Sequence, residues 1–76
     1  MDKREQLIEY ITQDIIAFLI DDRHIDISEA MRLFYTSDTY EKLLDKETGL
    51  YLEGSSYIYD IFKDECKNGH IIQNEY

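Results

Sequence analysis

The sequence predicts an all-α fold: a small bundle with one long N-terminal helix, two short middle helices and a C-terminal helix. Apolar residues recur at three- and four-residue steps through the first 22 residues, which is the period of an amphipathic helix. Serines suited to helix starts divide the remainder, and only residues 50–52 alternate as a strand does. With 76 residues, we expect a single helical domain over 1–76.

The long helix is expected over 1–22. Its apolar face collects six regularly spaced residues: Leu7, Ile8, Ile11, Ile15, Phe18 and Leu19. The opposite face is polar at Glu9 and Gln13 and becomes apolar at Ile16 and Ile20. A helix that is apolar all round must be covered on more than one side. Either later helices or a second copy of the chain cover this end, so Ile16 and Ile20 are the candidate face of a homodimer.

Residues 21–26, with the sequence DDRHID, interrupt the helical period and are expected to form a loop. Carboxylates beside a histidine raise one alternative function, a small metal- or ligand-binding domain that uses Asp22, His24 and Asp26. Metal ligands usually come from several elements at defined spacing, and acidic loops of this kind are commonly solvated surface. The pattern favours a solvated loop, and we expect no metal and no cofactor.

Two short helices are expected next. Ser28 is the predicted N-cap of the first. Its inner face is expected to carry Ala30, Met31, Phe34 and Tyr35. A second capping cluster at 36–38 predicts another short helix over about 38–44. This pair raises a further alternative, a helix-turn-helix-like regulatory accessory. Because 37–45 holds three acids against one lysine, we expect no direct binding of nucleic acid.

The last part of the chain contains a turn, a short apolar segment and a final helix. Gly49 suits the turn, and 50–52 is expected to be extended, either as a linker or in a minimal pairing beside 70–72. The last helix is expected to begin at Ser55 or Ser56 and to stop at Asn68-Gly69. Its predicted inner face holds Tyr57, Ile58, Ile61, Phe62 and Cys66, with Tyr59 pointing elsewhere.

The charge balance narrows the class of partner. A net charge of −9 opposes phosphate backbones and anionic lipid surfaces, and it suits a basic protein partner. The longest apolar run, 15–20, is far too short for a bilayer, which needs about 20 residues. The first residues lack the pattern of a secretory signal, and Cys66 is the single cysteine. We therefore expect a cytoplasmic protein that does not act at a membrane.

The chain shows no motif of a phosphate loop, nucleophile elbow or paired-cysteine site. Cys66 and His70 could be imagined as a thiolate and its base. Such a pair needs a third orienting group and a cleft, and Cys66 is better explained as a small buried apolar residue. We expect no enzymatic activity and assign no catalytic residue.

Tyrosines and acids gather around the second glycine. Tyrosine is favoured at interfaces, because its ring buries area while its hydroxyl stays hydrated or bonded. The candidate interaction surface consists of Tyr51, Glu53, Tyr57, Tyr59 and Asp60. In the alternative interpretation, Tyr51 and Tyr57 are half-buried core residues.

Residues 54–61, with the sequence GSSYIYDI, resemble a family of short bacterial helical proteins, the domain-of-unknown-function 3791 family. Its members share an amphipathic first helix, a short second helix and a glycine followed by Tyr-Ile and Asp-Ile in a final helix. The order of elements is similar across most of this chain. The resemblance implies a bacterial protein-binding role, such as the antitoxin-like partner of a small gene pair, and it transfers no catalytic residue.

These observations favour a non-enzymatic protein–protein interaction module. Its partner is expected to be a second copy of the chain, giving a homodimer, or a basic bacterial protein.

Overall fold

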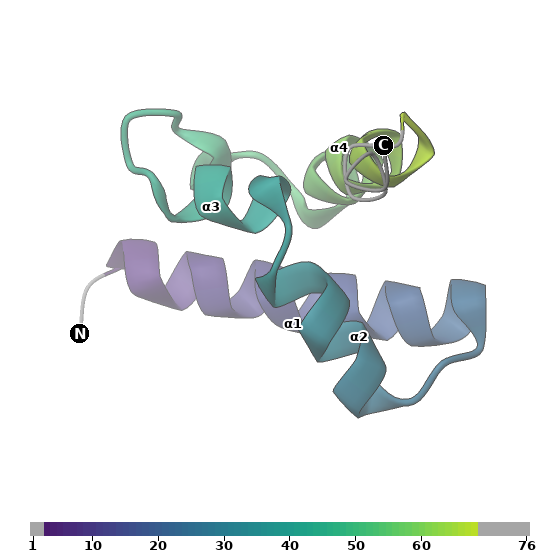
Figure 1. Ribbon diagram of the computed structural model, residues 1–76. Coiled ribbons are helices and arrows are strands. Elements are labelled where there is room, and N and C mark those ends of the chain that lie inside the picture. The colour runs from purple at the N-terminus through teal and green to yellow at the C-terminus, as the bar shows by residue number, and fades with distance from the viewer. Residues whose placement is uncertain (1–2, 69–76) are drawn as a thin grey trace.

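Residues 3–68, which the computed structural model describes, contain four α-helices and one short 3₁₀ helix, with no strand among them. The elements, in order, are α1 (Lys3–Arg23), α2 (Ile27–Tyr35), α3 (Asp38–Leu44), η1 (Leu50–Leu52) and α4 (Ser55–Lys67). The all-α prediction with one long N-terminal helix is confirmed (Figure 1). No helix in this part of the chain combines the length and the apolarity needed to cross a bilayer.

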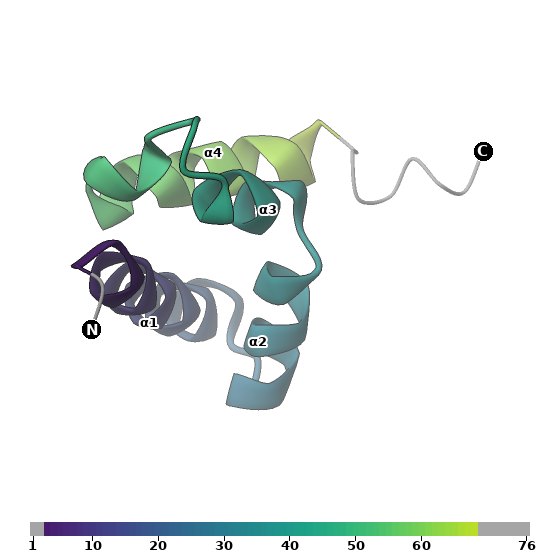
Figure 2. The same cartoon turned by 90° about the vertical axis from the view of Figure 1, so that its left-hand side faces the viewer.

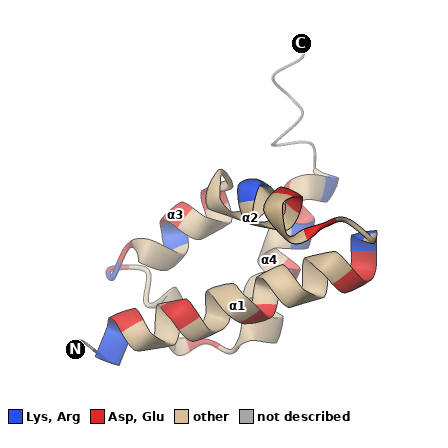
Figure 3. Ribbon diagram, turned by 90° about the horizontal axis from the view of Figure 1, so that it is seen from below, with Lys and Arg blue, Asp and Glu red and all other residues tan. Residues whose placement is uncertain are grey.

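The helices form two levels. Seen along α1, α3 and α4 lie over one side of it, and α2 packs against a different side (Figure 2). No charged residue lies between Asp14 and Asp21 of α1, so the part of its second half between these two residues is drawn wholly in tan in Figure 3. This apolar stretch is where α2 and α4 meet α1, as expected for the part of the helix that most needs cover.

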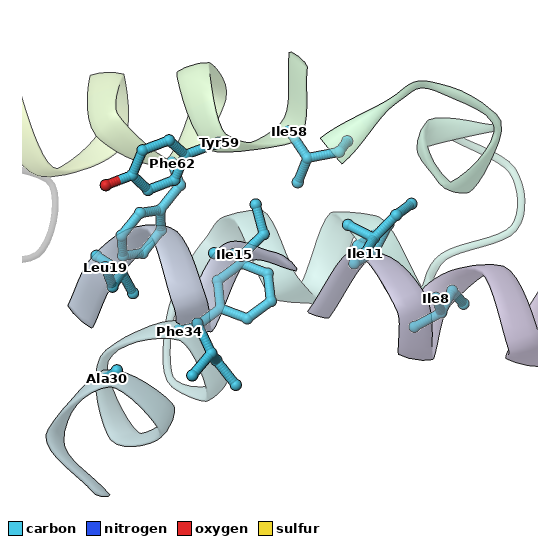
Figure 4. Close-up of a cluster of buried hydrophobic side chains, with 11 residues drawn as sticks. Ile8, Ile11, Ile15, Leu19, Ala30, Phe34, Ile58, Tyr59 and Phe62 are labelled. Atoms are coloured by element: carbon cyan, nitrogen blue, oxygen red, sulfur yellow. The ribbon is translucent and has the colours of Figure 1, made fainter. Parts of the chain in front are cut away.

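A single core joins all four α-helices (Figure 4). Phe34 of α2 is fully buried and lies edge-on to Phe62 of α4, with ring centroids 5.6 Å apart. Its ring also meets Tyr40 of α3 edge-on at 5.3 Å. Ile15 and Leu19 of α1 are fully buried in the same cluster. Phe34 thus connects the three shorter helices to one another above α1.

The connection between α1 and α2 is shorter than the expected loop over 21–26, because α1 continues through Arg23, and it also differs from expectation at the cap. His24 ends α1 in the left-handed region, with φ of 55°, and its N–H donates to the carbonyl of Ile20. Asp26, and not the predicted Ser28, is the N-cap of α2: its carboxylate accepts from the N–H of Glu29 at 2.9 Å. Because aspartate caps as well as serine does, the helix begins one residue before Ser28, at Ile27.

The first turn of α3 is held from two sides. Ser37 is its N-cap, as the capping cluster predicted, and its hydroxyl accepts from the N–H of Tyr40 at 3.1 Å. The Glu65 carboxylate of α4 accepts from the N–H groups of Asp38 and Thr39, each at 2.9 Å. It also accepts from the Thr39 hydroxyl at 2.7 Å. A carboxylate at a helix N-terminus is favoured by the helix dipole, so Glu65 binds α3 to α4.

The expected extended segment at 50–52 is a turn of 3₁₀ helix, η1, and the prediction of a strand-like pairing there is wrong. The 70–72 segment proposed as its partner lies outside the described residues. Local bonds satisfy the backbone of η1: Leu52 donates to Gly49, and Glu53 donates to Leu50. Gly49 has φ of 67°, which lets the chain turn into η1 without the strain of a side chain.

The final helix begins and ends where the sequence indicated, at Ser55 and before Asn68. The Ser55 hydroxyl donates to the Asp14 carboxylate of α1 at 2.6 Å. The buried residues of α4 are Ile58, Tyr59 and Phe62. The inner face is therefore rotated from the prediction: Tyr57 points outward, half-exposed at 52%, and Tyr59 points inward.

We expect Glu65→Ala to lower the free energy of unfolding by about 1–3 kcal/mol, since it removes the acceptor of hydrogen bonds to the start of α3. Urea denaturation followed by circular dichroism measures this loss. Asp64→Ala, at the exposed neighbouring position of α4, is the matched control and should change stability little. An equal loss in both variants would contradict the role given to Glu65.

Candidate functional site

The outer flanks of α1 and α2 enclose an open groove of about 400 Å³, which we call the α1–α2 groove. Its lining combines residues of both helices: Glu9, Thr12, Gln13, Ile16, Ala17, Ile20, Ile27, Met31 and Tyr35. Both candidate dimer residues from the sequence, Ile16 and Ile20, lie in this groove. Ile16 is buried at 9% exposure and Ile20 is half-buried, so α2 covers part of the all-round apolar end of α1.

The α2 wall of the groove is an exposed apolar ridge. Ile27, Met31 and Tyr35 follow each other at four-residue steps and are 58%, 37% and 42% exposed. Ala30 and Phe34, by contrast, are fully buried. The predicted inner face of α2 was therefore half wrong: it holds Ala30 and Phe34, while Met31 and Tyr35 belong to the ridge. Neighbouring exposed apolar side chains of this kind mark interaction sites more often than isolated ones do.

A second hollow of about 470 Å³ continues the groove toward the start of α1. The two hollows share Glu9, Thr12 and Tyr35. Its remaining lining residues are Arg4, Glu5, Ile8, Tyr40 and Leu44. The rings of Tyr35 and Tyr40 meet edge-on at 5.0 Å, and burial followed by the neighbouring Tyr35 raises the pKa of Tyr40. Together the hollows form one trough along α1, walled by α2 and α3.

The surface predicted around the second glycine is only partly present. Tyr57, Glu53 and Asp60 are exposed, and Asp60 pairs with Lys63 at 3.7 Å. Tyr51 is half-buried and packs against the core, in line with the core interpretation, whereas Tyr57 is a surface residue. Tyr59, at 7% exposure, belongs to the core.

Tyr59 is held on several sides. Its hydroxyl donates to the Asp22 carboxylate of α1 at 2.7 Å. Its ring lies 5.0 Å from that of Phe18, and the Lys63 ammonium lies 5.0 Å over it. Burial, then the hydrogen bond to Asp22, raises the pKa of the Tyr59 phenol far above its ordinary value. Tyr59 thus binds α4 to the end of α1. Its predicted place on an exposed interaction surface is wrong, because the side chain is buried.

The structure does not assemble the proposed metal ligands. Asp22 accepts from Tyr59 and Asp26 caps α2, so both carboxylates have structural partners, and His24 is an exposed residue at the end of α1. Within residues 3–68 no three His, Cys, Asp or Glu side chains gather as a metal site. Burial raises the pKa of the half-buried Cys66 thiol, which disfavours a thiolate. Its imagined base, His70, lies outside the described residues.

No family model matches the chain, and neither a curated protein nor a solved structure matches it. The resemblance at 54–61 therefore stays a prediction. The groove residues that the sequence interpretation missed are Ile27, Met31 and Tyr35. They form a row at four-residue steps, turned by about 100° around α2 from the row of Ala30 and Phe34. Because both rows have the same spacing, the pattern showed two candidate faces and did not say which one lies in the core.

We expect Tyr59→Phe to lower the free energy of unfolding at pH 7 by about 1 kcal/mol, since it deletes the bond to Asp22. The folded state holds the phenol proton more tightly than the unfolded state, whose pKa is near the ordinary 10.0. The contribution of Tyr59 is therefore complete below pH 10 and is lost as the pH rises above it. Urea denaturation from pH 7 to 11 should show the gap between wild type and variant closing.

Tyr57→Phe is the matched control, because Tyr57 lies two positions away on the exposed side of α4. It should leave stability unchanged throughout this pH range. A gap between wild type and Tyr59→Phe that stays constant above pH 10 would contradict the assigned hydrogen bond.

Proposed function

We propose that this protein is a non-enzymatic protein–protein interaction module and that the α1–α2 groove is its contact surface. The observation that carries the proposal is the exposed ridge of Ile27, Met31 and Tyr35 facing Ile16 and Ile20 across the groove. Interface centres are enriched in aromatic residues and methionine and depleted in charge. Among the described residues that line it, Glu9 alone is charged, which matches that composition.

The shape of the site supports a helical ligand. An open groove between two helices, with apolar side chains at four-residue steps along one wall, is the surface into which an amphipathic helix lays its apolar face. The lining supplies apolar area together with Gln13, an exposed polar side chain that can orient a ligand by hydrogen bonds. Within residues 3–68, no cysteine, serine or histidine lines the groove as a nucleophile or its base.

The setting follows the sequence-based expectations. The proposal places the protein in the bacterial cytoplasm, where a lone cysteine stays reduced. The resemblance to the 3791 family supports a binding role of the antitoxin-like kind, in which the module covers a partner encoded beside it. Self-association through the same groove, giving a homodimer, is the competing mode of assembly.

An affinity pull-down from the native cell tests the proposal. The groove variant combines Ile27→Ser, which suits a helix start, with Met31→Gln, which keeps the length of the side chain. We expect the protein captured by wild type to be recovered about tenfold less with this variant, since interface anchors are each worth about 1–2 kcal/mol.

The matched control combines Leu52→Gln with Tyr57→Gln, which removes comparable exposed apolar side chains from η1 and α4. It should capture the partner as wild type does. Loss of the partner with this control, and retention with the groove variant, would move the contact surface to the glycine region. Circular dichroism confirms that each variant is folded.

A further inference from the structure

The trough formed by the two hollows has two chemically different ends. Toward the end of α1, Ile16, Ala17 and Ile20 face the apolar ridge of α2. Toward the start of α1, the carboxylates of Glu5 and Glu9 line the trough. Arg4 lines this end as well, and its guanidinium donates to the carbonyl oxygen of Leu44 at 3.4 Å. The lining is therefore apolar at one end and weakly acidic at the other.

We infer that the occupant of the trough is a basic amphipathic helix of a partner protein. Its apolar residues pack against Ile16, Ile27 and Met31, and its lysines or arginines lie beside Glu5 and Glu9. This inference rests on the proposed function and names the chemistry of the partner. Potentials of opposite sign across an interface speed association and fix the orientation of the ligand.

The length of the trough sets the length of the ligand. Its lining runs along α1 from Arg4 to Ile20. At 1.5 Å per residue this span is about 24 Å, so it accommodates a helix of about 16 residues, or four to five turns. A ligand of this size would cover the exposed part of Leu44 together with the ridge of Ile27, Met31 and Tyr35.

Charge separates this occupant from a second copy of the chain. Each chain carries −9, so pairing two copies brings like charges together, a repulsion that is strongest at low ionic strength. A basic helix gains from the same field. The two occupants therefore respond to salt in opposite directions: added salt weakens the basic helix and strengthens the homodimer.

The test uses three labelled 18-residue peptides and fluorescence anisotropy. The first has leucines at a helical repeat flanked by lysines, the second has glutamates in place of the lysines, and the third is the lysine peptide in scrambled order. At low salt we expect the lysine peptide to bind at least about tenfold more tightly than either of the others. Its advantage over the glutamate peptide should shrink as screening increases, whereas its advantage over the scrambled peptide of equal charge should persist. The Ile27→Ser and Met31→Gln double variant should weaken it about tenfold.

The acidic end is tested by Glu5→Gln with Glu9→Gln, which should weaken the lysine peptide about fivefold. The same change relieves repulsion of the glutamate peptide, so it should strengthen that peptide or leave it weak, and never weaken it further. Glu47→Gln with Glu53→Gln is the matched control: it changes the net charge equally at exposed positions next to α3 and η1. If the two double variants weaken the lysine peptide equally, or if the scrambled lysine peptide binds as tightly as the ordered one, the inference is overturned. Binding would then reflect only the overall negative charge of the protein.

Two further outcomes separate this inference from the proposed function. If the glutamate peptide binds as tightly, or if sedimentation shows a dimer that the groove variant dissolves and salt strengthens, the basic helix is wrong while the groove remains the contact surface. If the Ile27→Ser and Met31→Gln double variant binds every peptide as wild type does, and also captures the native partner as wild type does, both the proposed function and this inference are wrong.

Discussion

The second half of α1 sets the constraint that the rest of the structure must meet. Residues 15–20 are apolar on every side of the helix, so burying all of them would require cover around its whole circumference. Ile15 and Leu19 are fully buried in the common core. Ile16 is buried beside α2, but a second helix of only nine residues leaves Ile20 half-covered. The α1–α2 groove is the part of this apolar belt that residues 3–68 leave uncovered.

Periodicity and capping residues predicted the four α-helices well, because both signals are local. The helix from Asp38 to Leu44 follows directly from the Ser37 cap. The start of α2 was displaced because two capping residues, Asp26 and Ser28, compete within three positions, and local rules rank them equally. Whether residues 50–52 form a strand depends on a neighbouring strand that can pair with them. The local sequence pattern does not contain that information.

The candidate site was harder to predict, because it depends on which way each helix is turned. Tyr57 and Tyr59 lie two positions apart and have the same chemistry, so composition cannot decide which one faces the core. The Asp22 carboxylate, 37 positions away in sequence, favours the inward orientation of Tyr59 because it accepts a hydrogen bond from the Tyr59 hydroxyl. In the same way Phe34, by meeting Phe62, turns α2 so that Met31 and Tyr35 face outward. Contacts between residues distant in sequence therefore decide which side chains are exposed. For this reason the candidate surface in the structure is the α1–α2 groove and not the predicted region around the second glycine.

The Glu65 carboxylate also has a consequence for how the protein moves. A helix of seven residues, as α3 is, has little stability of its own, so it depends on its neighbours, and α4 holds its first turn through Glu65. Tyr40 and Leu44 of α3 wall the trough, so undocking of α4 would weaken this wall. Hydrogen exchange at the amides of Asp38 and Thr39 would therefore report the opening of α4. By linkage, a ligand that requires the ordered wall would slow exchange at these two amides without touching either of them.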